Sequence, residues 1–402
     1  PNNLVFHGGT LRYLGETVAT DRPATLNAGA IVEVASNETS LTLNGALTGA
    51  GGLTKAGPGT LVLGVANTHA GGTVIGSGRL QVNANAATGT GGLTNNASTL
   101  RVQGALVLDN VVDWSGNCGL EFNGVGGNNT ALRGAWSGNG TVNVYFVSAN
   151  ASQTFTIGGA GAGGGHMWNF AGTVDFGTNS GFLRINNDNS TFNFGSSNAT
   201  FNLGTGTGVL NQRNGSTTTY LGALIGGPGT RVAGRGNTGA SGTTTYEIGG
   251  NNLSTTFEGE INNGSGTTAL TKVGTGTLAL TGTNTYSGST LVQNGTLQVD
   301  GALTASPSVS VLGGTLAGRG TISGAVDVQV GGTLSVGDGI PGQMTINSTL
   351  TFASGSTNFV EINKSDSVID NVTGLTGVSY GGTLVISMVQ GTLANGDSFK
   401  LF

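Results

Sequence analysis

Short runs that alternate between apolar and polar residues recur along the chain. Residues 60–63 are Thr-Leu-Val-Leu, and residues 80–82 are Leu-Gln-Val. Successive side chains of a strand point to opposite sides, so alternation is the period of a strand with one buried face. We therefore expect Leu61 and Leu63 to face a core, with Val62 on the outer face.

These runs belong to a longer repeat. Residues 53–82 are LTKAGPGTLVLGVANTHAGGTVIGSGRLQV, and they align without a gap to residues 270–299, LTKVGTGTLALTGTNTYSGSTLVQNGTLQV. In this alignment Leu278 and Leu280 take the inward positions and Ala279 takes the outward one. A gapless repeat of this length indicates a repeat architecture rather than two unrelated domains.

A shorter period lies inside the long one. The triplet Gly-Thr-Leu begins at Gly276, Gly295, Gly314 and Gly332, with 18 or 19 residues between successive copies. One coil of a parallel β-helix has this length and buries its inward side chains only against neighbouring coils. The expected fold is all-β: a single chain wound as a right-handed parallel β-helix (β-solenoid) with about 18–20 residues per coil.

We expect residues 1–402 to form one continuous β-solenoid that is a segment of a longer polypeptide. Regular coils are expected over 1–100, which holds the first strong repeat, and over 236–402, which holds the second. Residues 101–235 repeat less cleanly and are rich in aromatic residues. There we predict irregular coils with a stack of Phe side chains in the lumen.

The pattern shared by the two repeats resembles the passenger-associated β-strand repeat of autotransporters and related secreted bacterial proteins. Residues 255–261 (TTFEGEI) and 396–402 (GDSFKLF) are similar to coils that flank this repeat. The resemblance implies a β-helical passenger domain that is extracellular and displayed on the bacterial cell surface. It implies no particular activity.

Composition narrows the classes of partner. Charged residues make up 8 % of the chain, whereas roughly a quarter is ordinary. The 14 basic and 19 acidic residues form no dense basic cluster, so we expect no nucleic-acid partner. No apolar run approaches the roughly 20 residues of a membrane-spanning helix, so the chain is not expected to be transmembrane. A single cysteine, Cys118, suits a bacterial exterior.

Enzymatic chemistry is not expected. Polysaccharide-degrading β-helices gather carboxylates in a groove, as a catalytic pair or as ligands of Ca²⁺. The acidic residues that could take such a role are scattered along the sequence: Glu121, Asp175, Asp188, Glu247, Glu258, Glu260 and Glu361. No serine lies in a nucleophile elbow and no glycine-rich stretch ends as a phosphate loop. We expect no catalytic residue, no metal site and no cofactor.

Four residues of the irregular region are candidates for ligand binding: Arg133, Trp136, Tyr145 and Trp168. If they are exposed, the aromatic rings could stack on sugars. The alternative is that they belong to the core.

The terminal segments have the pattern of strands. The residues concerned are Leu4, Val5 and Phe6 at one end, and Phe399, Leu401 and Phe402 at the other. The last coil of a solenoid exposes unpaired backbone groups, which must be covered. Either further coils of the same polypeptide continue from these ends, or another subunit stacks on them. The second case is a head-to-tail contact that gives a fibre.

The leading functional hypothesis is a secreted bacterial surface rod with a structural role, as a fibre, layer or stalk. The alternative is an adhesin that binds a glycan or a cell surface through residues 101–235. A polysaccharide-degrading enzyme is the third hypothesis, and the scattered acids count against it.

Overall fold

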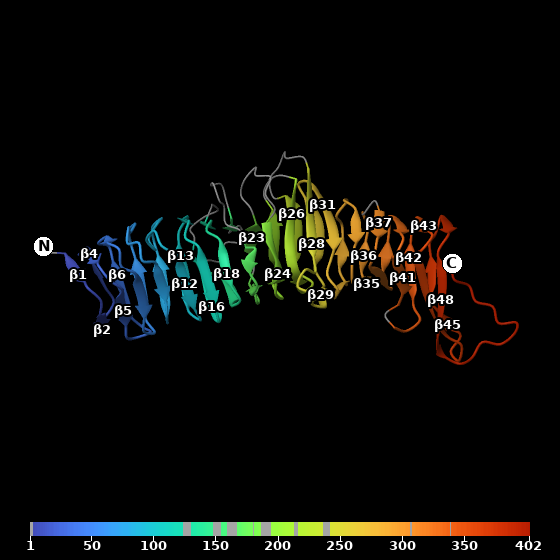
Figure 1. Ribbon diagram of the computed structural model, residues 1–402, viewed down its shortest axis with the longest axis horizontal. Helices are drawn as coiled ribbons and strands as arrows, with labels where there is room; N and C mark the ends of the chain where they lie inside the picture. The colour runs from blue at the N-terminus through green and yellow to red at the C-terminus, as the bar shows by residue number, and fades with distance from the viewer. Residues whose placement is uncertain are drawn as a thin grey trace. The chain divides into compact units, whose positions relative to one another are not determined.

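The computed structural model describes residues 3–123, 130–147, 154–158, 167–179, 181–185, 194–212, 216–235, 242–305, 308–337 and 339–402. All regular elements in these residues are β-strands, and nearly all pairings are parallel. The described residues up to Leu210 form one compact unit, and those from Asn211 form a second. Each unit is a stack of coils (Figure 1), so the predicted all-β parallel solenoid is confirmed.

In the first unit each coil passes through three flanks. Flank I contains β2 (Thr10–Tyr13), β5 (Ala30–Val34), β8 (Leu53–Ala56), β10 (Thr73–Ile75), β12 (Leu93–Asn96), β15 (Val112–Ser115), β18 (Trp136–Gly138) and β21 (Asn169–Phe170). Flank II contains β3 (Val18–Thr20), β6 (Ser40–Leu43), β9 (Thr60–Leu63), β11 (Arg79–Val82), β13 (Thr99–Gln103), β16 (Asn117–Asn123), β19 (Thr141–Phe146), β22 (Thr173–Asp175) and β24 (Phe194–Asn202). Flank III contains two separate sheets. The first is formed by β1 (Leu4–Phe6), β4 (Ala24–Leu26) and β7 (Leu47–Thr48), and the second begins with β14 (Val107–Leu108), β17 (Thr130–Leu132), β20 (Thr154–Ile157) and β23 (Gly181–Ile185).

The second unit also has three flanks. Flank IV contains β26 (Thr217–Ile225), β28 (Thr243–Ile248), β31 (Thr267–Lys272), β34 (Thr290–Val292), β37 (Ser308–Val311), β40 (Ala325–Val328), β43 (Thr349–Phe352) and β47 (Gly377–Tyr380). Flank V contains β29 (Thr255–Phe257), β32 (Thr277–Leu280), β35 (Thr296–Val299), β38 (Thr315–Gly318), β41 (Thr333–Val336), β44 (Thr357–Asn363), β45 (Val368–Ile369) and β48 (Thr383–Gln390). Flank VI contains β27 (Arg231–Arg235), β30 (Glu260–Gly264), β33 (Thr283–Asn284), β36 (Ala302–Leu303), β39 (Thr321–Ile322), β42 (Gln343–Ile346) and β46 (Asn371–Thr373). β25 (Gly208–Gln212) contains the boundary between the units.

The core of each unit is made of columns of inward side chains from successive coils. On flank I one column runs through Leu53, Thr73, Leu93, Val112 and Trp136, all of them buried. Successive members are 19 or 20 residues apart up to Val112, as predicted, and the last step is 24 residues. The later coils of the first unit are longer than predicted, since the next step on this flank, from Ser137 to Asn169, is 32 residues.

The Gly-Thr-Leu triplets mark successive coils of the second unit. Thr277, Thr296, Thr315 and Thr333 pair in register along flank V, with their side chains outward and the following leucines buried. The period read from the sequence is therefore the coil period. The same alternation buries Leu61, Leu63, Leu278 and Leu280, as predicted.

At one of the two predicted outward positions the burial differs from the expectation. Ala279 is half-buried on the outer side of β32, but Val62 on β9 is only 6 % exposed. The strand pattern places Val62 outward, and neighbouring groups cover it there. Burial at this position is therefore set by the surroundings of the coil and not by the strand period alone.

The predicted aromatic stack lies in the lumen of the first unit. The rings of Phe122 and Phe155 are stacked with centroids 3.9 Å apart, and Phe146 lies 5.9 Å from Phe122. Phe176 and Phe201 are fully buried as well. The prediction of a Phe core in these coils is therefore confirmed.

Candidate ligand-binding surface

The structure separates the four predicted binding residues. Trp136 is 1 % exposed, and its ring packs against Trp114 at 5.1 Å and against Phe170 at 5.6 Å between centroids. Its position continues the inward column of Leu93 and Val112. Trp136 is therefore a core residue with no exposed face for a ligand, which corrects the expectation for this residue.

Tyr145 and Trp168 are exposed, at 43 % and 51 %. Tyr145 lies on the outer face of β19, where it pairs in register with Glu121 of β16. The charges beside it are already paired, because the Glu121 carboxylate accepts hydrogen bonds from Arg79 Nη2 at 2.9 Å and from Arg101 Nε at 2.5 Å. At Tyr145 flank II therefore offers an aromatic ring, while the carboxylate of the paired Glu121 is already occupied by two arginines.

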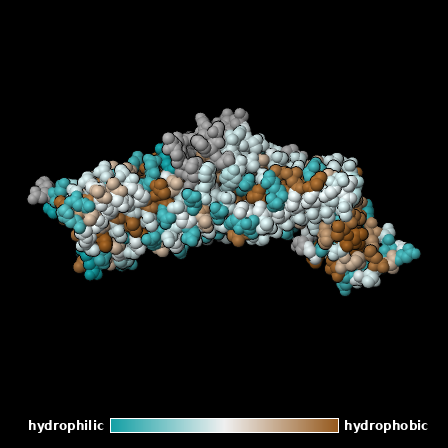
Figure 2. Space-filling model, in the orientation of Figure 1, coloured by the Kyte–Doolittle hydropathy of each residue, from teal (hydrophilic) through white to brown (hydrophobic). Residues whose placement is uncertain are grey.

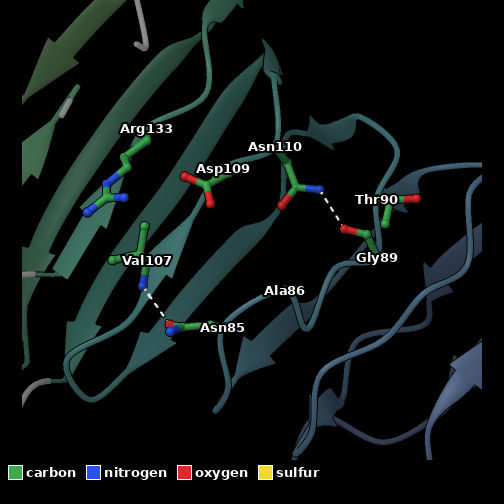
Figure 3. Close-up of a pocket in the computed structure, with 8 residues that line it drawn as sticks. All are labelled: Asn85, Ala86, Gly89, Thr90, Val107, Asp109, Asn110 and Arg133. Atoms are coloured by element: carbon green, nitrogen blue, oxygen red, sulfur yellow. Dashed lines mark hydrogen bonds between the residues drawn. The ribbon is translucent and has the colours of Figure 1, made fainter. Parts of the chain in front are cut away.

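Arg133 lines an open hollow of about 510 Å³ beside flank III of the first unit (Figure 3). Residues from three successive coils line it: Asn85, Ala86, Gly89, Thr90, Val107, Asp109, Asn110 and Arg133. Its volume lies within the roughly 300–1,000 Å³ that is usual for small-molecule sites.

The two charged residues of the hollow occupy the same corner of consecutive coils. Leu108 at the end of β14 pairs in register with Leu132 at the end of β17, and both are buried. Asp109 and Arg133 directly follow these leucines, and Arg133 N donates to Leu108 O at 2.8 Å. Since adjacent strands lie about 4.8 Å apart, the two side chains start side by side and share the hollow.

The amides around the hollow are fixed by hydrogen bonds to the backbone. Asn85 Oδ1 accepts from Val107 N at 2.8 Å. Asn110 Nδ2 donates to Gly89 O at 3.0 Å and to Gly91 O at 2.6 Å. Two of the three coils are thereby tied together at this point, and both amide side chains are held in place by the fold.

Both charges remain unpaired. In the part of the chain that the structure describes, neither Arg133 nor Asp109 forms an ion pair, and Arg133 Nε is buried without a hydrogen-bond partner. Asp109 is exposed and Arg133 is half-buried. Both groups are therefore available to a ligand in the hollow. The sequence did not reveal this pair, because the 24-residue coil that aligns Asp109 with Arg133 departs from the regular period.

The acidic residues that could have served catalysis are dispersed. Glu258 lies outside any strand, whereas Glu260 opens β30 and is bound by Arg231 Nε at 3.3 Å and by Thr285 Oγ1 at 2.6 Å. Over the described residues, no three of the His, Cys, Asp and Glu side chains come together as metal ligands. Asp188 lies outside the described residues.

Cys118 is buried, and its thiol contacts the carbonyl oxygens of Asn95 and Ser115. The described residues also contain no helix long and apolar enough to cross a membrane.

The predicted assembly residues lie on the first and last coils. Leu4, Val5 and Phe6 form β1, in which Val5 is 47 % exposed. They pair with β4, and Leu4 and Phe6 line an apolar hollow of about 120 Å³ at the opening of the lumen. The exposed apolar side chains of the last coil gather on β47 and β48 (Figure 2), where they include Val378, Leu384 and Ile386.

The final residues do not form the predicted strand. Residues 391–402 contain no strand; instead Leu401 O accepts from Val372 N at 3.0 Å. The Phe402 ring lies 6.4 Å from Phe352 and 6.2 Å from Tyr380. A backbone hydrogen bond at Leu401 and aromatic packing of Phe402 on flank IV thus replace strand pairing, and Phe399 is half-buried outside any strand.

Comparison with known proteins assigns the repeats. Residues 53–82 and 270–299 match the Passenger-associated-transport-repeat family. A 74-residue stretch, 18 % of this chain, is 47 % identical to the adhesin BmaC autotransporter of Brucella suis, and it covers 2 % of that protein. The chain thus matches only a small part of the length of this relative. Together the repeats and the solenoid make the chain similar to autotransporter passengers, and they indicate display outside the cell on the bacterial surface.

Proposed function

We propose that this passenger segment is adhesive, and that the hollow around Arg133 and Asp109 holds a ligand carried by another cell or surface. The observation that carries the proposal is that two opposite charges stand beside each other on consecutive coils, and that neither forms an ion pair with a described residue. If this corner served only to stack coils, the fold would be more stable with the two groups paired or replaced by apolar residues, because unsatisfied buried donors cost stability. The name of the Brucella relative, an adhesin, supports the same role.

The proposal assigns binding and no catalysis. The hollow contains one carboxylate, and glycoside hydrolysis by the usual route needs two. The coils supply a rigid support, and the corner residues supply the recognition, which is the usual division of roles in repeat proteins.

The test is attachment of the whole chain to cells. Beads coated with the 402-residue chain are incubated with cultured animal cells, and bound beads are counted. We expect Arg133→Gln with Asp109→Asn to reduce attachment at least tenfold. The matched control is Glu258→Gln with Lys400→Gln, which removes one exposed charge of each sign elsewhere. Equal attachment by both double variants would refute the proposal.

A second candidate role is structural, through end-to-end association of copies. The exposed apolar side chains of β1 and β48 support it, since an apolar strand with an unpaired edge is a template for pairing. Sedimentation of the chain at increasing concentration tests this role. We expect Val5→Lys to reduce any assembly without unfolding the chain, because Val5 is exposed. A chain that stays monomeric at high concentration rules the role out.

A further inference from the structure

We infer that the hollow around Arg133 and Asp109 takes a neutral sugar residue, which is held through two adjacent hydroxyl groups. Asp109 would accept hydrogen bonds from these hydroxyls and Arg133 would donate to them. The inference rests on the proposed adhesive function and names the chemistry of its ligand.

Charge is the first argument. Asp109 and Arg133 stand at the same corner of consecutive coils, and no other charged residue lines the hollow. An acidic sugar would gain a partner in Arg133 but bring its carboxylate beside Asp109, and a cation would meet the reverse problem. The pair has no net charge, so it favours a ligand without net charge.

Hydrogen-bonding capacity is the second argument. A guanidinium can only donate and an ionised carboxylate can only accept. A sugar hydroxyl does both, so two neighbouring hydroxyls satisfy both side chains at once. Asn85 adds a donor: its Oδ1 is occupied by Val107 N, while its Nδ2 has no partner in the described part of the chain. Arg133 forms no hydrogen bond or ion pair through its side chain with any described residue, so its guanidinium is available to a ligand acceptor.

Shape is the third argument. Ala86 and Val107 supply an apolar patch against which the C–H face of a sugar can pack, next to the polar groups. Figure 3 shows the Asp109 carboxylate directed toward the space below Arg133, with Asn85 across the opening. Asn110 is held by the backbone on the far side, so binding orders few side chains.

A zwitterionic ligand is the competing chemistry. It would form two ion pairs in an open hollow, where solvent screens them and makes each worth little. A sugar ring can in addition pack its C–H face on Ala86 and Val107, which a small zwitterion such as glycylglycine cannot do to the same extent. The sugar is therefore favoured.

The test uses the full chain and defined probes. Saturation-transfer NMR and calorimetry are run with the methyl glycosides of glucose, galactose, mannose and N-acetylglucosamine, and in parallel with galacturonic acid and with glycylglycine. We expect at least one neutral glycoside to bind. Asp109→Asn and Arg133→Gln should each weaken that binding at least tenfold, whereas Glu258→Gln and Lys400→Gln should leave it unchanged. Asp109 is exposed, so its variant keeps the test valid if Arg133→Gln unfolds the coil.

Three results would overturn the inference. The first is tighter binding of galacturonic acid than of every neutral glycoside, with a further gain in Asp109→Asn. The second is binding of glycylglycine in competition with the glycosides. The third is attachment to cells that depends on Arg133 and Asp109 while no glycoside binds, which leaves the proposed function standing. If attachment does not depend on these residues either, both proposals fail.

Discussion

The two repeats, 53–82 in the first unit and 270–299 in the second, build the same corner of a coil in different surroundings. Each places a lysine in the lumen: Lys55 is 0 % exposed and Lys272 is 1 % exposed. Lysine is almost never fully buried without a partner. Among the described residues neither lysine has an ion pair, so the partners must be uncharged.

Backbone carbonyls are the partners of Lys55. Its Nζ donates to Ala56 O at 2.8 Å, to Gly57 O at 2.7 Å and to Ser77 O at 3.0 Å. The first two acceptors are the last residue of β8 and the first residue of the turn that follows it, and the third is in the equivalent turn of the next coil. Gly57 has φ 76°, and a Cβ there would lie 2.4 Å from Val34 O, so this turn requires glycine.

Lys272 repeats this arrangement in the second unit. Its Nζ donates to Val273 O at 2.6 Å, to Gly274 O at 3.0 Å and to Asn294 O at 3.3 Å. Gly274 has φ 67°. The sequence offsets between lysine and acceptors are the same as in the first repeat. The lysine of the repeat is therefore a link between two coils, which uses one ammonium group to satisfy the carbonyls of two corners.

The repeats differ where His69 stands in place of Tyr286. His69 Nε2 lies 2.9 Å from Thr73 Oγ1, and Tyr286 OH lies 2.6 Å from Thr290 Oγ1. Burial lowers the pKa of His69 and raises the pKa of Tyr286, so both rings are neutral near pH 7. The second imidazole nitrogen, Nδ1, is buried without a partner. The lysine link between coils is thus kept in both repeats, whereas the aromatic ring differs between them.

The largest expected effect comes from a charge in the leucine column of either repeat. Leu61→Asp and Leu278→Asp should each destabilise the coil by several kcal/mol, because an unpaired carboxylate would enter a dry lumen. Substitutions at the outer positions should affect the two repeats differently. Ala279→Asp should leave the stability nearly unchanged, whereas Val62→Asp should cost about 1–3 kcal/mol because Val62 is buried. Hydrogen exchange of peptides from each repeat measures this. Equal effects of Leu278→Asp and Ala279→Asp would mean that the strand faces are misassigned.

Removal of the link comes next. Lys55→Met and Lys272→Met preserve the apolar stem but leave three carbonyls without their donor, so each should cost about 3 kcal/mol. The two losses should be similar, since the two sets of acceptors are equivalent. Lys400→Met is the control, because Lys400 is exposed. Hydrogen-exchange protection in each repeat is the measurement, and an effect confined to one repeat would show that the two links are not equivalent.

A further effect is expected from pH. Burial lowers the pKa of both Lys55 and Lys272 to about 8, although Glu33 opposes the shift at Lys55. In the unfolded chain a lysine has a pKa of about 10.4. Between these values the unfolded chain binds more protons, so the free energy of unfolding should rise with pH over this window. Urea titrations at about pH 7 to 10 should show this rise in the wild type and a smaller one in each Lys→Met variant. Identical pH profiles of the wild type and the Lys→Met variants would contradict the assignment of this rise to the two lysines.

The sequence predicted what depends on short-range alternation. The inward leucines of both repeats, the coil period and the aromatic lumen followed from patterns within a few residues. The role of Lys55 could not be predicted, because its third acceptor, Ser77 O, belongs to the next coil. The alternation does place Lys55 inward, but the charge of lysine argues for the surface. Only the stacking of coils shows how that conflict is resolved.

The candidate site was predictable only in part, for a related reason. Arg133 was singled out by its position in the irregular region, but its companion Asp109 was not. Register along a solenoid follows from coil length, and the step from Leu108 to Leu132 is longer than the period of the regular coils. Trp136 was misplaced because a Trp is suited equally to a sugar and to a core. Its inward column could be recognised only after the register was known.

The smallest effect distinguishes the two rings of the repeats. Tyr286→Phe removes the hydroxyl that meets Thr290 and should cost about 1 kcal/mol, the usual value of one hydrogen bond. His69→Phe also removes a hydrogen bond, to Thr73, but it eliminates the unpartnered Nδ1 at the same time. Thr73 keeps its bond to Thr88 O at 2.9 Å, so its hydroxyl is not left unsatisfied. The gain and the loss at His69 should nearly cancel, and the stability of the first repeat should change by less than about 0.5 kcal/mol. Hydrogen exchange of the two repeats in the two variants measures the difference. A loss at His69 as large as that at Tyr286 would show that the imidazole is required, and that the two repeats do not differ in the way described.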